Sequence, residues 1–301
     1  MLLDDIRNFG DALFDVYQEK DLDHHAFPDL ALAAIERTDL LSQLTQDGLR
    51  QIVTHAQELP RQRNSSATFG DPPVTLYNSP QESFYIEALY HTTASMAIHD
   101  HAFSGAFAVV SGECAHQIYD FFSDDSPGSL MVGELRPRPA QRLSAGVVHP
   151  IVNGMRFIHR NVHLDKPTIT VVIRTVWDRI HQHSYYYPGL ALDLGMSATE
   201  RKQLQLLIGM LSADEAAAAQ YLRNLVGTDM TPSHAYRCLD YFFKSATGQW
   251  DLDELLEAAR SRFGDQMAAV TSSLRQSQPV EPDLAQLVRE HVENNAKGQG
   301  S

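Results

Sequence analysis

The sequence is short of cysteine, of basic charge and of long apolar runs. With only Cys114 and Cys238, it has no disulfide framework and no thiolate zinc site, so a metal would need histidine, carboxylate or water ligands. Its 38 acidic residues outnumber 24 basic ones, and the net charge of -14 disfavours nucleic acid and anionic membranes. Runs such as "GAFAVV" are too short to cross a bilayer, and the acidic start does not resemble a signal peptide. We therefore expect a cytoplasmic protein that binds neither nucleic acid nor membrane.

The pattern of apolar residues changes twice along the chain. The first sixty residues show helical periodicity, with Leu49, Ile52, Val53 and Ala56 on one helix face. From about residue 74, short segments rich in β-branched and aromatic residues alternate with turn residues, which is typical of a β sandwich or barrel. The pattern indicates helices followed by a β core.

Helical periodicity returns after the β-rich region. Two capping-box patterns, Ser197 to Glu200 and Ser212 to Glu215, predict helix starts. We expect four parts: an N-terminal helical segment (1–70), a barrel (71–188), a C-terminal helical domain (189–295) and a disordered tail (296–301). The C-terminal helices could cap the barrel, form a homodimer interface or dock a partner, and the sequence does not choose among these.

Histidines are the side chains most suited to hold a metal here. In "AIHDH", His99 and His101 are two residues apart, so on a strand they project from the same face and could bind one ion. Further on, "RLSAGVVHPIVN" contains Gly146, His149 and Asn153. Taken alone, the His-x-His pair is equally consistent with two structural histidines.

Together, these two segments resemble the two conserved motifs of the cupin superfamily. His99, His101 and Gly112 match the first motif, and Gly146, His149 and Asn153 match the second, over about residues 74–177. The resemblance implies an α+β fold in which a cupin barrel, a double-stranded β-helix or jelly roll, carries N-terminal helices and a C-terminal helical extension. It also implies a metal held by His99, His101 and His149.

The chain departs from the cupin pattern at two positions. Gly105 stands where the motif has a glutamate ligand, and Ser144 where the second motif begins with proline. Three histidines without a carboxylate are similar to the ligand set of cysteine dioxygenase and related thiol dioxygenases. The resemblance then implies Fe(II), with other divalent transition metals compatible with the ligand type. His159 and His163 are interpreted as groups behind the ligands or at the surface.

The residues that bind cysteine in that family are absent here. "GDPPVTLYN" lacks the carboxylate-binding arginine, and the outer Ser-His-Tyr relay corresponds to Thr170, Val172 and Arg174. Strand alternation puts these three on one face, so Arg174 could hold a substrate carboxylate, or it could be a solvent-facing arginine at a strand end. Thr170 and Tyr90 are further candidates for substrate contact. Cysteine itself is not expected as the substrate.

Three function classes follow. The leading hypothesis is a mononuclear non-haem Fe(II) oxygenase of dioxygenase type, which uses O2 to oxidise a small anionic substrate that chelates the iron, such as a thiol or amino-acid derivative. No catalytic residue is predicted beyond the metal centre. The alternatives are an oxygen-independent metal cupin with isomerase or lyase activity, and a non-catalytic, metal-dependent sensor or binding protein.

Overall fold

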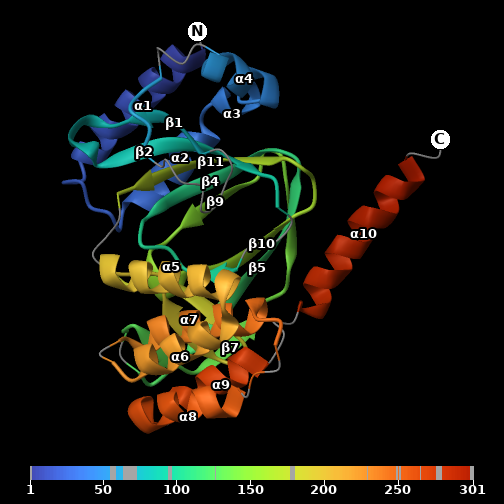
Figure 1. The fold of residues 1–301 in the computed structure, drawn as a ribbon. Helices are drawn as coiled ribbons and strands as arrows, with labels where there is room; N and C mark the ends of the chain where they lie inside the picture. The colour runs from blue at the N-terminus through green and yellow to red at the C-terminus, as the bar shows by residue number, and fades with distance from the viewer. Residues whose placement is uncertain are drawn as a thin grey trace. The chain divides into compact units, whose positions relative to one another are not determined.

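A computed structural model describes most of the chain. The described residues are 2–54, 59–63, 73–93, 97–125, 127–176, 180–228, 230–248, 250, 252–264, 266–275 and 280–298. The helices are α1 (Leu2–Gln18), α2 (Phe27–Glu36), α3 (Leu40–Gln43), α4 (Gln46–Thr54), α5 (Ala198–Ala213), α6 (Glu215–Val226), α7 (Pro232–Ser245), α8 (Leu252–Phe263), α9 (Gln266–Arg275) and α10 (Pro282–Gly298), with short 3-10 turns η2 (Pro80–Glu82) and η3 (Gly154–Arg156) (Figure 1). No helix among these residues is long and apolar enough to span a membrane.

The strands fill the middle of the chain, as predicted. They are β1 (Pro73–Asn78), β2 (Phe84–His91), β3 (Ile98–His99), β4 (Gly105–Ser111), β5 (Glu113–Phe122), β6 (Leu130–Val132), β7 (Glu134–Pro137), β8 (Gln141–Ser144), β9 (Val148–Ile151), β10 (Ile158–His163), β11 (Thr168–Thr175), β12 (His183–Tyr186) and β13 (Leu190–Asp193). The chain forms two compact units. Unit 1 comprises 1–120, 137–180 and 280–301, and unit 2 comprises 121–136 and 181–279.

The strand order of unit 1 identifies its fold. One sheet runs β1-β2-β11-β4-β9, and the other contains β3-β10-β5 with β8 paired to β5. If the eight strands β2, β3, β4, β5, β8, β9, β10 and β11 are taken in chain order, the sheets contain strands 1-8-3-6 and 2-7-4-5. This is the jelly-roll, or double-stranded β-helix, arrangement of two Greek keys. The predicted α+β fold, with a jelly-roll barrel and helices before and after it, is confirmed.

Successive side chains along the strands point alternately to the outside of the barrel, where they form a core with the N-terminal helices, and to its interior. Ile86, Ala88, Val171 and Ile173 face outward and pack against α1 and α2. On the inward face, Phe107 and Val172 join a second cluster with Phe103, Val109, Cys114, Leu143, Ile151 and Phe157. The predicted alternation of β11 is therefore confirmed, because Thr170, Val172 and Arg174 point away from the helices.

Two motif glycines shape the turns of the jelly roll. Gly112 joins β4 to β5 with φ 78°, and Gly146 lies between β8 and β9 with φ 91°. Positive φ is accessible to glycine at little cost but strained for other residues. The sequence motifs thus mark the two turns that bring the histidine-bearing strands into register.

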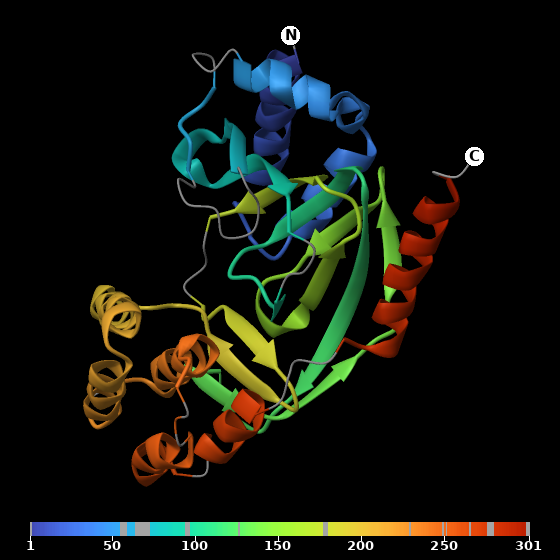
Figure 2. The ribbon, with the colours of Figure 1, turned by 45° about the vertical axis from the view of Figure 1, so that its right-hand side comes forward.

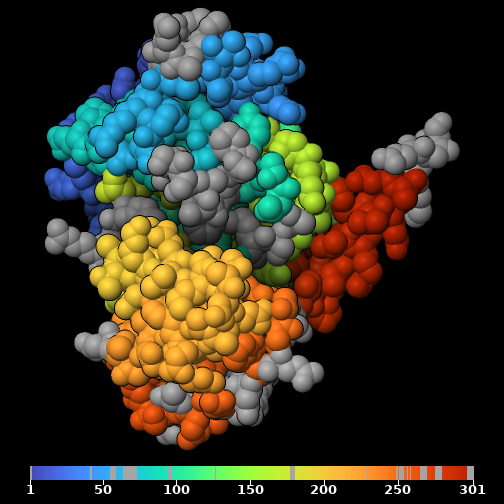
Figure 3. Space-filling model, in the orientation of Figure 1, coloured from blue at the N-terminus to red at the C-terminus, as the bar shows by residue number. Residues whose placement is uncertain are grey.

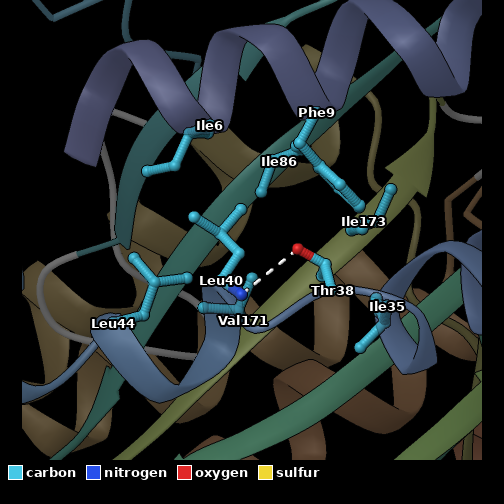
Figure 4. Close-up of a pocket in the computed structure, with 9 residues that line it drawn as sticks. All are labelled: Ile6, Phe9, Ile35, Thr38, Leu40, Leu44, Ile86, Val171 and Ile173. Atoms are coloured by element: carbon cyan, nitrogen blue, oxygen red, sulfur yellow. Dashed lines mark hydrogen bonds between the residues drawn. The ribbon is translucent and has the colours of Figure 1, made fainter. Parts of the chain in front are cut away.

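A small apolar cavity lies between the N-terminal helices and the first sheet (Figure 4). Its volume is about 10 Å³, which is room for one water molecule at most. It is lined by Ile6, Phe9, Ile35, Thr38, Leu40, Leu44, Ile86, Val171 and Ile173. Because it lies on the outward face of β2 and β11, the sheet separates it from the barrel interior.

Unit 2 combines β6, β12 and β13 with helices α5 to α9. Strand β13 pairs with both β12 and β6, and its Leu190 and Leu192 enter a core with α5 to α9. Helices α5 to α7, in yellow to light orange, form the upper part of the face of this unit that is seen in Figure 3, and the darker orange of α8 and α9 lies below them. The Ser197–Glu200 capping box at the start of α5 is confirmed. The predicted Ser212 box is wrong, because Ser212 continues α5 and Asp214 caps α6.

The compact units cross the domain boundaries predicted from the sequence. Strands β6 and β12, expected in the barrel, belong to unit 2, whereas α10, expected in the C-terminal helical domain, belongs to unit 1. Figure 2 shows α10, in red, beside strands of the barrel. Helix α10 contributes Leu284 to a cluster with Ala115 and Val162 on the outer face of β5 and β10. Residues 296–298 of the predicted disordered tail continue α10, and 299–301 lie outside the described residues.

Candidate metal centre

Among the histidines that project into the interior of the jelly roll, five lie close together, on four strands and one loop. His99 lies on β3 and His101 follows it, His116 lies on β5, His149 on β9, and His159 on β10. Strand alternation explains the inward direction of His116 and His159, since Ala115 and Val162 on the other face pack against α10. Phe103, Phe107 and Phe157 surround these imidazoles with apolar rings.

Three of the five histidines form a group that could hold one metal ion. His99, His101 and His159 each offer a nitrogen, and these atoms lie within 4.8 Å of one another. The Nε2 atoms of His101 and His159 are 3.0 Å apart. Two nitrogens each about 2.1 Å from one ion are separated by about 3.0 to 3.4 Å, depending on the angle between them, so this pair fits a shared ion.

The surroundings of these rings also suit metal ligation. His99 Nδ1 donates to the carbonyl oxygen of Ala97 over 2.9 Å, which fixes the tautomer that carries its lone pair on Nε2, the nitrogen that would bind a metal. Within the described part of the chain, the buried Nδ1 of His101 has no hydrogen-bond partner. The three side chains are almost fully buried, so water competes poorly for their nitrogens. The donor set is all imidazole, which favours zinc or a first-row transition metal over magnesium or calcium.

Burial keeps these imidazoles neutral. Burial lowers the pKa of His99, and it holds the pKa values of His101 and His159 well below the ordinary value. For His101 the nearby His99 and Arg174 lower the pKa further. A neutral imidazole has the lone pair that a metal requires, so the site needs no deprotonation at pH 7.

A hydrogen-bond chain leads from the three-histidine group toward the surface. His159 Nδ1 is 3.0 Å from His116 Nε2, and His116 Nδ1 is 3.1 Å from the amide nitrogen of Gln141. The same amide nitrogen lies 2.9 Å from His149 Nε2. Gln141 is exposed on β8, whereas His116 is fully buried. The chain fixes the ring orientation of His159, as outer partners of metal ligands commonly do.

The structure brings His99 and His101 together, as the sequence predicts, but their third neighbour is His159. His149 lies outside this group, half-buried, with its ring 5.0 Å from that of His116 and stacked at 5.8 Å on Phe107. His149 as a ligand stays a prediction. The interpretation of His159 as a surface group is wrong, since it is buried and lies opposite His99 in the β3–β10 pairing.

Gly105, which stands in place of the expected glutamate, has a backbone reason. It pairs with Arg174 of β11, and an added Cβ would overlap the carbonyl oxygen of Ile173. Such a Cβ would also lie 2.9 Å from the Cα of Arg174. No side chain fits there without moving β4 from β11, so position 105 cannot supply a carboxylate ligand.

The three candidate substrate residues lie in different environments. Arg174 is largely enclosed, with 11% of its side chain exposed; its guanidinium is 2.9 Å from the Glu87 carboxylate and lies 4.8 Å and 4.6 Å from the rings of Tyr85 and Phe103. The alternative of a solvent-facing arginine is therefore wrong. Thr170 Oγ1 is 2.9 Å from His91 Nε2. Tyr90 packs against the outer core, so it lies on the wrong face of β2 to meet a substrate in the barrel.

Sequence reasoning missed several residues in and around the barrel interior. His159, His116, Gln141 and Glu87 carry no motif, and their convergence depends on strand register across two sheets. The alternation of His159, Asn161 and His163 along one strand is the one local signal that could have indicated an inward polar row.

Comparison with known proteins adds little to this geometry. No family model and no curated protein matches the chain. Among solved structures, a double-stranded β-helix protein from Klebsiella pneumoniae is 15% identical and covers 46% of this chain and 94% of its own, with TM-score 0.25. The DMSP lyase DddQ from Ruegeria pomeroyi is 15% identical, covering 54% and 78%, with TM-score 0.30. A cupin-2 protein from Shewanella frigidimarina is 12% identical, covering 44% and 95%, with TM-score 0.25. Likenesses this weak carry no argument about activity.

Proposed function

We propose that the protein is a mononuclear metalloenzyme, an Fe(II) oxygenase that oxidises a small anionic substrate inside the jelly roll. The observation that supports it is the buried, neutral group of His99, His101 and His159, with two Nε2 atoms 3.0 Å apart. In this proposal His159 is the third ligand, and no protein carboxylate joins the site. When bound, Fe(II) would supply the reducing centre for dioxygen and attract an anionic donor.

The charges around the site favour an anionic substrate. The three imidazoles are neutral, and the Arg174 cation is paired with the Glu87 anion at 2.9 Å. The buried Asp100 carboxylate, whose charge acts on His99, would offset one of the two charges of a divalent ion and leave the other for an anionic substrate. A thiolate, enolate or carboxylate would reduce that excess charge. Arg174 could meet a carboxylate only by sharing its guanidinium with Glu87.

The side chains around the histidines would orient the substrate and exclude water. The rings of Phe103 and Phe157 lie 4.6 Å and 4.7 Å from those of His101 and His159, and Phe107 stacks on His149. These apolar walls lower the local dielectric, which strengthens the attraction between a metal and an anionic donor. They fit a small organic acid or thiol better than a highly polar sugar.

Oxygen uptake by iron-loaded protein tests this function. Protein loaded anaerobically with Fe(II) is mixed with small thiols, amino acids and diketone-like acids, and oxygen consumption and products are measured. We expect a substrate-dependent uptake that falls at least 100-fold in His159→Ala and persists in His25→Ala, whose imidazole is exposed. The proposed oxygenase activity would be contradicted if the protein does not bind iron, or if His159→Ala leaves oxygen uptake unchanged. Equal turnover under argon would also contradict it.

A further inference from the structure

The exposed amide of Gln141 begins a hydrogen-bond chain that ends among the three histidines. We propose that Gln141 sets the direction in which this chain donates, and that metal binding reverses the direction through rotation of the Gln141 amide. The inference rests on the proposed metal site. It makes Gln141 a positioning residue, and it brings His149 into the site's behaviour without making it a ligand.

In the structure as it stands, the donors point inward. The amide nitrogen of Gln141 can only donate, and it faces both His116 Nδ1 and His149 Nε2, at 3.1 Å and 2.9 Å. His116 must therefore carry its proton on Nε2, from which it donates to His159 Nδ1 over 3.0 Å. His159 then carries its proton on Nε2 and donates to His101 Nε2 over 3.0 Å.

A metal at the three-histidine group requires the opposite direction. His159 can bind the ion through Nε2 only if that nitrogen gives up its proton and Nδ1 carries one instead. His159 Nδ1 must then donate to His116 Nε2, and His116 must donate from Nδ1 toward residue 141. The amide nitrogen already facing His116 cannot accept that proton.

Rotation of the Gln141 amide removes the conflict. It places the carbonyl oxygen where the nitrogen was, facing both His116 Nδ1 and His149 Nε2, so that the oxygen accepts from both rings. Each ring stays neutral and the number of protons is conserved: each of His159, His116 and His149 loses a proton at one nitrogen and gains one at the other. Gln141 can rotate because it is exposed, whereas His116 and His159 are buried.

The tautomer of His116 is the direct readout. Two-bond nitrogen–proton NMR spectra of protein labelled with 15N-histidine are recorded without metal and with one equivalent of Zn(II), which is diamagnetic. We expect the proton of His116 on Nε2 without metal and on Nδ1 with zinc. The same tautomer in both states would overturn the inference, and this readout does not depend on a variant that folds.

A substitution at Gln141 gives a second test. Gln141→Glu provides only acceptors, so it should fix His116 in the Nδ1–H form before metal arrives and raise Zn(II) affinity about tenfold, measured by competition with a chelator. Ala145→Glu, which adds the same charge on the neighbouring exposed turn, is the matched control and should change affinity less than threefold. If Zn(II) affinity rises equally in both variants, the added negative charge causes the gain, and the direction of the hydrogen bonds from residue 141 does not.

The outcomes separate the inference from the function on which it rests. If wild-type protein binds zinc and His159→Ala does not, but the His116 tautomer is unchanged, the metal site stands and the role of Gln141 falls. If wild-type protein binds neither Zn(II) nor Fe(II), both fall.

Discussion

Arg174 and Glu87 form an ion pair in the barrel interior, and the stability of the barrel depends on both partners of this pair. Glu87 is fully buried and Arg174 is 11% exposed, with 2.9 Å between the guanidinium and the carboxylate. Removal of one partner leaves the other charge buried in a low dielectric, which typically costs 3–5 kcal/mol. The pair therefore holds β2 to β11 from inside the barrel.

Arg174→Met should lower the free energy of unfolding by about 3 to 5 kcal/mol, because Glu87 loses its counter-charge. The double variant Glu87→Gln/Arg174→Met should recover part of that loss, because no isolated charge remains. Urea denaturation of the three proteins measures both effects. If Arg174→Met is as stable as the double variant, an unpaired Glu87 costs no stability, so the ion pair does not stabilise the barrel. The role of Arg174 would then be limited to substrate binding.

Gly105 leaves no room for a side chain between β4 and β11. Because an added Cβ would overlap the Ile173 carbonyl, Gly105→Ala should destabilise unit 1 by about 3 kcal/mol or more. Gly209→Ala is the control, since an added Cβ there meets nothing within 4 Å. Thermal unfolding compares them. Full stability of Gly105→Ala would mean that position 105 has room for a side chain, and with it for the missing carboxylate.

At the scale of elements, a histidine pair joins the two sheets of the jelly roll. His91 of β2 and His163 of β10 stack with ring centroids 3.9 Å apart and planes inclined by 9°. Burial lowers the pKa of His91 to about 3, with a smaller contribution from His163, and burial lowers the pKa of His163 to about 4. The folded barrel thus keeps both rings neutral where the unfolded chain would protonate them.

This pair predicts loss of stability in acid. Both folded pKa values lie below the unfolded value of about 6.5, so the stabilisation is complete above pH 6.5 and is lost as pH falls toward 4 and 3. Within that window each histidine contributes about 1.4 kcal/mol per pH unit. His163→Gln should reduce the slope of unfolding free energy against pH by about that amount, measured by urea denaturation between pH 5 and 7. An unchanged slope would contradict the buried neutral pair.

For the whole molecule, the sequence predicted the architecture better than the site. Periodicity located the two helical regions and the β-rich middle of the chain, and motif glycines such as Gly112 and Gly146 marked real turns. Domain boundaries were harder, because β6 and α10 join units distant in the chain. The residue beside His99 and His101 could not be chosen from spacing, since His159 meets them through β3–β10 register, which one sequence does not determine.

In the proposed function, His99, His101 and His159 hold one metal ion inside the jelly roll. Elemental analysis gives the metal bound per chain for wild type, His159→Ala, His149→Ala and His25→Ala prepared side by side. We expect about one ion per chain in wild type and His25→Ala, an ion that is retained but bound more weakly in His149→Ala, and none in His159→Ala. Full occupancy in His159→Ala together with none in His149→Ala would show that His149, and not His159, is the third ligand.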